Sequence, residues 1–393
     1  MAKKRGNNEG SIFKRNDGKW CSQLTVGKNL DGSPKRKYFY GKTRQEVSQK
    51  MNKAINSLMT GSFVDSSSIT VAEWLHIWLF EYKRNSVRPS TFDSYETLSR
   101  VHICPALGII KLKDLRPEHL QNFYNEKFQS GLSTRTIKYL HTIMHAALKQ
   151  AIKNNLVVRN VSEATTLPKQ KKSEIKILSI QEQTKFINAL DGDRLKAAFI
   201  LALSTGVRQG ELLALRWKYV DLVEGTIKIR SNLQRVNNSD PNVPTKTILI
   251  FQEPKTQNGN RTIPLPDAIV EILKQHRKSQ LEEKLVAGEL YENNDLVFAT
   301  VLGKPIDPKN LVRRFKLLLK QAELDYINFH ALRHTYATRL LEINEHPKVV
   351  QELMGHSDVR ITLDIYSHVM PEIKKEAANK INHLFETNNK QVQ

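Results

Sequence analysis

Cysteine, long apolar runs and grouped acidic residues are all scarce in this chain of 393 residues. Its two cysteines, Cys21 and Cys104, match neither a metal spacing nor a disulfide framework, so we expect both to be reduced and structural. The best apolar run, 197–203, is far shorter than the about 20 residues that a membrane-spanning helix needs. The start, MAKKRGNNEG, is basic but lacks the apolar stretch of a signal peptide, so we expect a cytosolic protein.

Positive charge is what the chain has in excess. It contains 61 Lys and Arg against 40 Asp and Glu, a net charge of +21 with a pI near 9.8. Such a surplus indicates a polyanionic partner, with nucleic acid first and an anionic membrane surface second. The length predicts two or three domains of about 150 residues, and 39% hydrophobic residues suffice for a core in each.

The most basic part of the chain is its beginning. Residues 1–60 hold 14 Lys and Arg against 4 Asp and Glu, nearly half of the total surplus. Alternating apolar and polar residues around turn signals at 16–18 and 31–34 predict a three-stranded antiparallel sheet. A helix is expected over 43–58. We therefore predict a separate nucleic-acid contact domain over 1–62.

A helical domain is predicted over 68–165, after a polar, serine-rich linker at 61–68. Thr70 and Glu73 form a capping box at its first helix. Three more helical patterns follow, at 90–103, 117–129 and 133–154.

The last predicted domain spans 174–385, with a tail at 371–393, and mixes helices with a small sheet. It follows the basic linker 167–173, and Ser179 with Glu182 caps its first helix. Helices are expected near 180–190, 193–204, 209–217, 266–284, 308–322 and 330–343, and strands at 226–230, 247–252, 261–265 and 296–299. The expected fold class is a multidomain, mainly α protein with small β-sheets.

An arginine in an apolar neighbourhood is the first candidate site residue. In the stretch STGVRQGE, an apolar helix ends at a glycine turn and the next begins at Arg208. Buried arginines are usually paired, so a salt bridge from Arg208 to Glu211 is the favoured interpretation of this stretch alone.

A second arginine lies on the apolar side of a predicted helix. In FHALRHTYATRL, Arg333 falls inside the apolar arc and His330 lies at its edge. A planar cation beside an imidazole suits a phosphate. His330 and His334 also have the spacing of a zinc pair, but Ala331 replaces the expected glutamate and no third ligand is evident. Taken alone, His334 is favoured as a core histidine.

Three further residues carry little information one by one. Lys255 lies in a polar turn between two strand-like runs, His356 follows a glycine at a helix end, and Tyr366 lies in a short segment. A structural role is the commoner explanation for each. No compact cluster of Asp and Glu is near them to hold Mg²⁺, so any DNA cleavage here should be metal-free.

Together and in this order, these stretches resemble the tyrosine recombinases, the phage integrase family, over essentially the whole chain. The resemblance rests on TGVRQGELLALRW, on PKT followed by RTIPL, on HALRHT and on LMGHSDVRITLDIYSH. One departure is Tyr219, which stands where the family often has an acid, while Asp221 keeps the second acid. We interpret this departure as structural.

The resemblance implies an active site and a role for each of its residues. Arg208 and Arg333 would clamp the phosphate, Tyr366 would be the nucleophile, Lys255 the general acid, His330 the base and His356 a hydrogen-bond donor to the phosphate. Glu211 would orient Arg208 without contacting the phosphate itself. The implied catalytic set is Arg208, Lys255, His330, Arg333, His356 and Tyr366.

The resemblance also implies a function. The expected protein is a site-specific DNA recombinase that integrates and excises a prophage or an integrative conjugative element through a 3′-phosphotyrosyl intermediate, without metal or ATP. Its N-terminal domain resembles the arm-type DNA-binding domain of larger integrases, so core-type and arm-type attachment sites in double-stranded DNA, and a homotetramer on that DNA, are implied. Residues 70–385 would form a clamp around the crossover site.

Several alternatives stay open at this point. A type IB topoisomerase shares the chemistry but would not need an arm-binding domain, and a DNA-binding regulator would not need competent residues at all six positions. The need for an excisionase or a DNA-bending host protein is also open. The tail 371–393 carries a helical apolar stripe, which is expected to pack either on its own domain or on a neighbouring protomer. The expected location of the protein is the bacterial cytosol.

Overall fold

The computed structural model describes residues 10–28, 32–59, 69–169, 176–238, 245–254 and 259–363. The chain divides into two compact units, Met1–Lys171 and Lys172–Gln393, and each is described by itself. The tail 371–393 lies outside the described residues. No helix in the described part of the chain is both long and apolar enough to cross a membrane.

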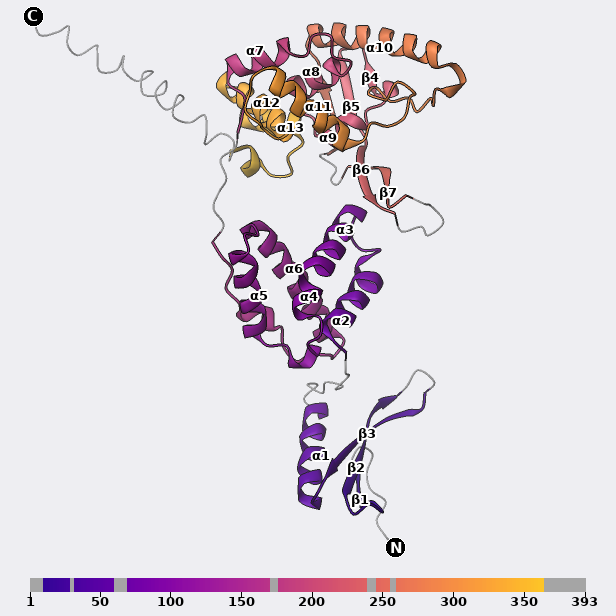
Figure 1. The fold of residues 1–393 in the computed structure, drawn as a ribbon, viewed down its shortest axis with the longest axis vertical. Coiled ribbons are helices and arrows are strands. Elements are labelled where there is room, and N and C mark those ends of the chain that lie inside the picture. The colour runs from indigo at the N-terminus through magenta and orange to yellow at the C-terminus, as the bar shows by residue number, and fades with distance from the viewer. Residues whose placement is uncertain are drawn as a thin grey trace, which may run out of the picture. The chain divides into compact units, whose positions relative to one another are not determined.

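The first elements form an antiparallel sheet beside one helix (Figure 1). Strands β1 (Ser11–Lys14), β2 (Trp20–Lys28) and β3 (Pro34–Gly41) pair in the order β1-β2-β3, and α1 (Arg44–Met59) follows. Cys21 and Leu24 of the sheet are buried together with Val47, Met51 and Ala54 of the helix. The predicted three-stranded sheet and helix are confirmed.

Helices build the rest of the first unit. They are α2 (Val71–Ile77), which continues as a π-helical turn (Trp78–Lys83); α3 (Pro89–Leu98), a second π-helical turn (Ser99–Ile103) and α4 (Cys104–Leu107); α5 (Pro117–Gln129); α6 (Thr134–Lys153); and 3-10 turns at Leu112–Asp114 and Val161–Ala164. The capping box is present, because the Thr70 hydroxyl accepts from the Glu73 N–H and the Glu73 carboxylate accepts from the Thr70 N–H. Trp74 ties α2 to α6 through a buried hydrogen bond from Nε1 to the Ala147 carbonyl, at 3.0 Å.

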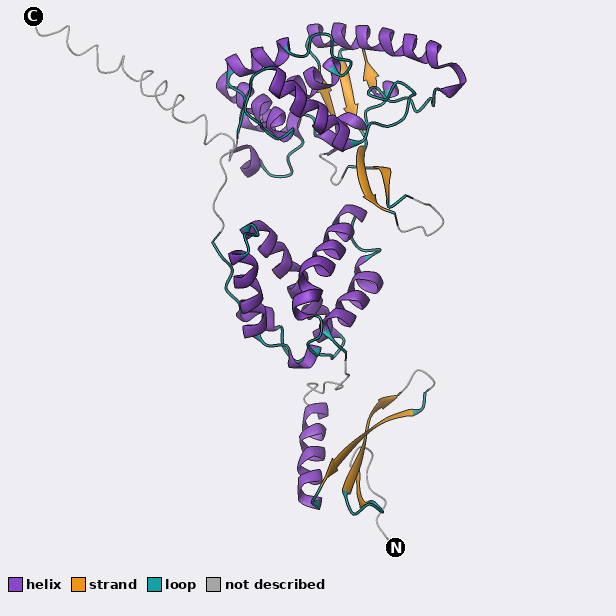
Figure 2. Cartoon of the chain, viewed as in Figure 1, coloured by secondary structure: helices purple, strands orange, loops and turns teal. Residues whose placement is uncertain are grey.

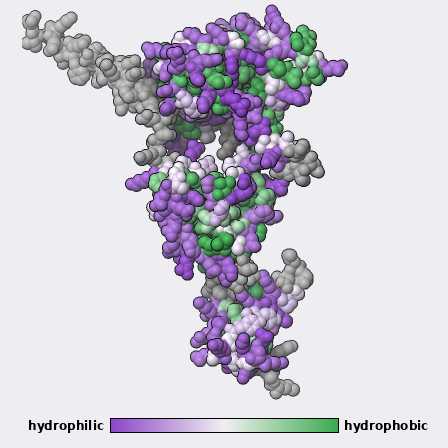
Figure 3. All heavy atoms as spheres, in the orientation of Figure 1, coloured by the Kyte–Doolittle hydropathy of each residue, from purple (hydrophilic) through white to green (hydrophobic). Residues whose placement is uncertain are grey.

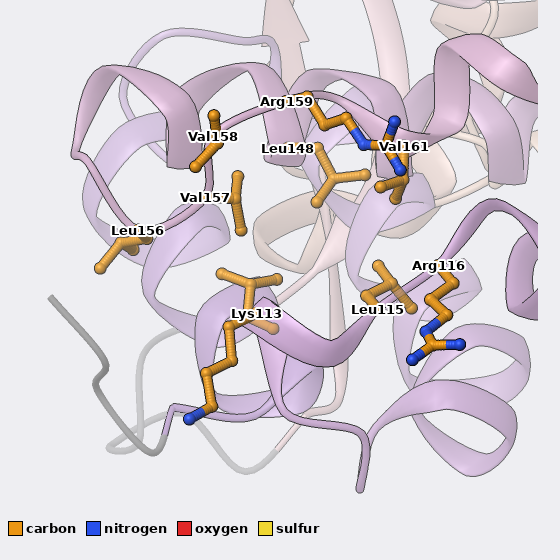
Figure 4. A pocket seen from close by; sticks show the side chains of 10 residues that line it. Lys113, Leu115, Arg116, Leu148, Leu156, Val157, Val158, Arg159 and Val161 are labelled. Carbon is orange, nitrogen blue, oxygen red and sulfur yellow. The ribbon is translucent and has the colours of Figure 1, made fainter. Parts of the chain in front are cut away.

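A pocket of about 440 Å³ opens in this helical part (Figure 4). Its walls are mainly leucine and valine, and Lys113, Arg116 and Arg159 are its basic residues. None of the site residues that the structure describes lines it.

The second unit combines helices with two small sheets (Figure 2). Strands β4 (Val220–Asp221), β5 (Thr226–Ile229) and β8 (Arg261–Pro264) form one antiparallel sheet, while β6 (Asn232–Asn237) and β7 (Thr247–Gln252) form a separate pair. The helices are α7 (Ile180–Asn188), α8 (Lys196–Thr205), α9 (Gln209–Leu213), α10 (Asp267–Ala287), α11 (Pro308–Gln321), α12 (His330–Glu342) and α13 (Pro347–Met354), with 3-10 turns at Trp217–Tyr219 and Gly288–Leu290. The predicted fold class is confirmed.

Two local predictions for this unit were wrong. The run 296–299 is not a strand, because only Leu296 and Ala299 form isolated bridges. The helix expected over 209–217 ends at Leu213, and the carbonyl of Leu215 instead accepts a hydrogen bond from Val297 at 2.9 Å. These two apolar stretches pack on each other and are buried without forming a helix or a strand. Periodicity alone cannot distinguish such a buried stretch from regular secondary structure.

Helix α8 is the centre of the core of the second unit. Eight of its residues are buried, and a helix that is apolar on all sides must be surrounded by other elements. Its Phe199 ring contacts the rings of Phe186, Phe315 and Phe329 from α7, α11 and the start of α12. Figure 3 shows hydrophilic residues over most of the visible surface of this unit, in keeping with an apolar interior. The residues that follow α8 thus start from a helix that the core encloses.

Candidate active site

Arg208 lies at the junction between α8 and α9. Gly206 ends α8 in the left-handed conformation, with φ of 62°, and Arg208 is the residue that precedes α9. The Arg208 N–H donates to Oε2 of Glu211 at 3.0 Å, and its Nη1 donates to Oε1 at 2.8 Å. The predicted salt bridge is therefore present, and its carboxylate caps the helix that follows Arg208.

Glu211 is shared with a second arginine, Arg261 at the start of β8. Nη2 of Arg261 lies 2.9 Å from Oε2 and Nη1 lies 3.3 Å from Oε1. The side chains of Glu211 and Arg261 are only 5% and 7% exposed. Burial by itself raises the pKa of Glu211, but the charges and hydrogen bonds of Arg261 and Arg208 outweigh burial and lower this pKa to about 2.

Arg261 was not among the predicted site residues. Its only signal in the sequence is its position in the stretch RTIPL, directly after the turn that contains Lys255. A single arginine at the end of a polar turn is ordinarily solvated, so the sequence did not indicate its burial.

Arg333 is buried on α12, with 2% of the residue exposed. Its Nη1 donates to the Gly206 carbonyl at 2.5 Å and its Nη2 donates to the Met354 carbonyl. Burial, followed by the charges of Arg208 and Arg261, lowers the pKa of Arg333 to about 9. The guanidinium therefore stays charged at neutral pH, held by two backbone oxygens rather than by a carboxylate.

The C-terminal end of α13 gathers three guanidinium groups. The last carbonyls of a helix lack partners within the helix and carry partial negative charge. Three successive carbonyls accept hydrogen bonds from three different arginines: Leu353 from Arg261 at 2.8 Å, Met354 from Arg333, and Gly355 from Arg208 at 3.2 Å. This arrangement lets three like charges lie in one small region.

His356 follows directly and is also buried, with 6% of the residue exposed. Its Nδ1 lies 2.9 Å from the hydroxyl of Thr362, and its carbonyl accepts from Gln351 Nε2 at 3.1 Å. Burial, then the charges of Arg333 and Arg208 and the neighbouring histidines, lowers the pKa of His356 to about 3. The imidazole is therefore neutral at pH 7.

His330 is the first residue of α12 and remains accessible to solvent. Its ring meets that of His334 edge to face, with 4.7 Å between the centroids. Packing around the ring, His334, and the charges of Arg333 and Arg208 lower the pKa of His330 to about 4. The imidazole is therefore neutral at pH 7 and accessible, and it can accept a proton, although more weakly than an ordinary histidine.

The structure thus brings four of the six predicted catalytic residues to one place, from three parts of the second unit: Arg208, His330, Arg333 and His356. Lys255 and Tyr366 lie outside the described residues. Within the described ranges, no three His, Cys, Asp or Glu residues are grouped as metal ligands. Fixed guanidinium groups beside neutral imidazoles suit an anionic group with several oxygens, such as a phosphodiester.

Comparisons with known proteins agree with this chemistry. The phage integrase family matches residues 176–372, and the N-terminal SAM-like domain of phage integrases matches residues 70–128. A tyrosine recombinase XerC-like protein of Caldanaerobacter subterraneus subsp. tengcongensis is 38% identical over 372 residues, which are 92% of this chain and 95% of that protein.

Solved structures share the fold. The Tn1549 transposon integrase in complex with transposon right end DNA has a TM-score of 0.65 at 22% identity, over 79% of this chain and all of that chain. A lambda integrase tetramer bound to a Holliday junction has a TM-score of 0.56 at 20% identity, over 92% of this chain and 96% of that chain. The family matches half of the residues of this chain, and one relative is 38% identical to it. The chain therefore belongs to the phage integrase family.

Proposed function

We propose that this tyrosine-type site-specific recombinase holds the scissile phosphate with Arg208 and Arg333 and cleaves the DNA with Tyr366. The reaction cleaves and rejoins DNA through a 3′-phosphotyrosyl intermediate, and so integrates and excises a mobile genetic element. The observation that supports the proposal is the convergence of two guanidinium groups and two neutral imidazoles at the end of α13.

The two arginines would stabilise the charge that develops on the non-bridging oxygens. Both side chains are held by backbone carbonyls before any DNA binds, so little reorganisation is needed when the phosphate arrives. Arg208 is 39% exposed along its side chain and would meet the phosphate from the open side. Arg333 would act from the buried side.

Proton transfers would complete the step. The Tyr366 oxygen attacks phosphorus while its proton passes to His330, and the bond from phosphorus to the 5′-oxygen breaks. Lys255 gives a proton to that oxygen, leaving a free 5′-hydroxyl and a 3′-phosphotyrosyl bond. The reverse sequence rejoins the strands, so the bond energy is conserved and neither ATP nor a metal ion is required.

His356 would bind the phosphate with one defined nitrogen. A neutral imidazole has a single N–H, and its other nitrogen accepts. If the Thr362 hydroxyl donates to Nδ1, the proton resides on Nε2 and can be donated to a phosphate oxygen. The low pKa of His356 favours this neutral form.

Double-stranded DNA would contact both units. The crossover site would lie on the helical and catalytic parts, in a homotetramer, as the Holliday-junction complex of lambda integrase suggests. The β1–β3 sheet would bind arm-type sites. It exposes Phe13, Tyr38 and Tyr40, and Tyr38 directly follows the basic stretch 35–37 of β3. The protein would act at the nucleoid in the bacterial cytosol. An excisionase and a DNA-bending host protein are further partners to test.

The decisive experiment uses a nicked suicide duplex that carries the junction sequence of the element, incubated with the protein in EDTA and separated on a denaturing gel. We expect a denaturant-stable adduct with the wild type and with Tyr326→Phe, an exposed tyrosine of the same unit. Tyr366→Phe should form none. With specific binding verified, the absence of an adduct from the wild type would contradict the proposal, as would cleavage that needs Mg²⁺.

A further inference from the structure

We infer that Arg261 is a positioning residue of the reaction, which holds the Glu211 carboxylate and through it the guanidinium of Arg208. The inference rests on the proposed function, because it assigns Arg261 a part in binding the scissile phosphate. Arg261 itself would not touch the DNA.

The contacts of Glu211 form a closed set. Each carboxylate oxygen accepts one hydrogen bond from Arg208 and one from Arg261: Oε1 from Nη1 of both, and Oε2 from the Arg208 N–H and from Arg261 Nη2. A carboxylate has about four acceptor sites, so these four bonds use its capacity. Neither oxygen can turn toward Arg208 without losing a bond to Arg261.

Arg261 is itself anchored on the opposite side. Its Nε donates to the Leu353 carbonyl at 2.8 Å, and its backbone pairs with Ile229 in the sheet. One side chain thus joins three elements: strand β8, the first turn of α9 through Glu211, and the C-terminal end of α13. Met354 and Gly355, whose carbonyls hold Arg333 and Arg208, come directly after Leu353.

Charge gives the arrangement a second consequence. With Arg208 as its only partner, the Glu211 carboxylate would neutralise the charge that the phosphate needs. Because Arg261 shares the carboxylate, the group of three retains one net positive charge beside the phosphate site. Burial is the main cause of the lowered pKa of Arg333, and the charges of Arg208 and Arg261 lower it further.

The matched control is Arg194. Its Nε and Nη2 contact both oxygens of Glu283, at 2.5 and 2.6 Å, and its Nη1 donates to the Ala299 carbonyl. Arg194 therefore makes the same kinds of contact as Arg261, with a carboxylate and a backbone carbonyl, in the same unit but without contact to the four gathered site residues. Its side chain is more exposed, at 33% against 7%. Arg194→Gln removes the same charge and the same kinds of bond.

The test measures single-turnover cleavage of the suicide duplex by the full chain, with DNA binding and thermal unfolding recorded alongside. We expect Arg261→Gln to cleave about 10- to 100-fold more slowly than the wild type, a loss of the size seen when the residue that orients a metal ligand is removed. Arg261→Lys, which keeps the charge but not the planar fork, should lie in between. Arg194→Gln should cleave within about twofold of the wild type.

A second substrate separates positioning from general damage. In a duplex with a methylphosphonate at the scissile position, a neutral methyl group replaces one charged oxygen, so a misplaced Arg208 matters less. The deficit of Arg261→Gln should then shrink to within about threefold of the wild type, whereas a folding defect would slow both substrates equally. Should Arg261→Gln not fold, Arg261→Lys supplies the comparison.

Equal deficits on both substrates, or wild-type cleavage of the ordinary duplex by Arg261→Gln, would overturn the inference. Failure of the proposed function is a different result, since the wild type itself would then form no adduct dependent on Tyr366.

Discussion

Arg333 donates a hydrogen bond from Nη1 to the carbonyl of Gly206, at 2.5 Å. The bond connects the buried arginine of α12 to the turn that ends α8, and Arg208 follows that turn. The direction of the Gly206 carbonyl depends on a left-handed backbone, with φ of 62°. The geometry of the two arginines that we propose to bind the phosphate therefore depends on this one glycine.

Gly206→Ala should reduce both stability and cleavage. A Cβ at this position would lie 2.7 Å from Cδ1 of Tyr336 and 2.8 Å from Sδ of Met354, and the left-handed backbone adds further cost. We expect a loss of about 1–2 kcal/mol from the backbone, and about 1–3 kcal/mol more from crowding, in the free energy of unfolding. Urea unfolding and single-turnover cleavage measure the two effects.

Gly192→Ala is the control for this substitution. Gly192 also has a positive φ, of 76°, but an added Cβ would meet no atom within 4 Å. This variant should lose only the backbone contribution and cleave as the wild type does. Equal losses in the two alanine variants would show that contact with Tyr336 and Met354 is unimportant.

Glu211→Gln should be among the most damaging substitutions in the second unit. The amide removes the negative charge with which Arg208 and the buried Arg261 both pair. Removing one partner of a buried ion pair lowers the free energy of unfolding by about 3–5 kcal/mol. Cleavage should fall with stability, measured by urea unfolding and single-turnover assay. Glu283→Gln, in the more exposed pair with Arg194, should lose much less, and an equal loss there would contradict the assignment.

Thr362→Val should slow cleavage by releasing the His356 ring. The threonine is fully buried, and its hydroxyl is the partner of Nδ1. Valine keeps the shape but leaves a buried imidazole nitrogen without a partner, at a cost of about 1–3 kcal/mol. Thr362→Ser, which retains the hydroxyl, should restore most of the cleavage rate. If the valine and serine variants cleave alike, the hydroxyl does not orient His356.

Acid should destabilise the second unit through two buried groups. The folded-state pKa of His356, about 3, lies below its ordinary 6.5, and that of Glu211, about 2, lies below 4.5. As the pH falls, each group binds a proton in the unfolded chain before it does so in the folded protein. The contribution to stability is therefore lost from pH 6.5 toward 3 for His356 and from pH 4.5 toward 2 for Glu211.

Urea unfolding of the full chain between pH 7.5 and 5 checks this dependence, in a range where Glu211 stays ionised. His356 should contribute a slope of up to about 1.4 kcal/mol per pH unit. His356→Gln should make the profile shallower over this range, and His330, whose pKa is also lowered, should account for part of the slope that remains. A variant profile as steep as that of the wild type would show that His356 is not held neutral in the folded protein.

Local features were predictable from the sequence. The capping boxes at Thr70 and Ser179 are present, and α5 (Pro117–Gln129) has the predicted bounds, because caps and helix periodicity act over a few neighbouring residues. The apolar arc of α12 likewise indicated that Arg333 is buried. Where two apolar stretches pack on each other, as at 214–215 and 296–299, the sequence pattern was ambiguous.

By itself, then, the sequence determined most of the helices, the basic N-terminal sheet and the motifs of the family. Only the tertiary structure decided that Glu211 is shared by two arginines, and that three successive carbonyls at the end of α13 receive three arginines. Arg208 is 147 positions from Gly355, and Arg261 is 92 positions from Leu353. Contacts between residues so far apart depend on how α8, β8 and α13 pack around one core, and no local pattern contains that information.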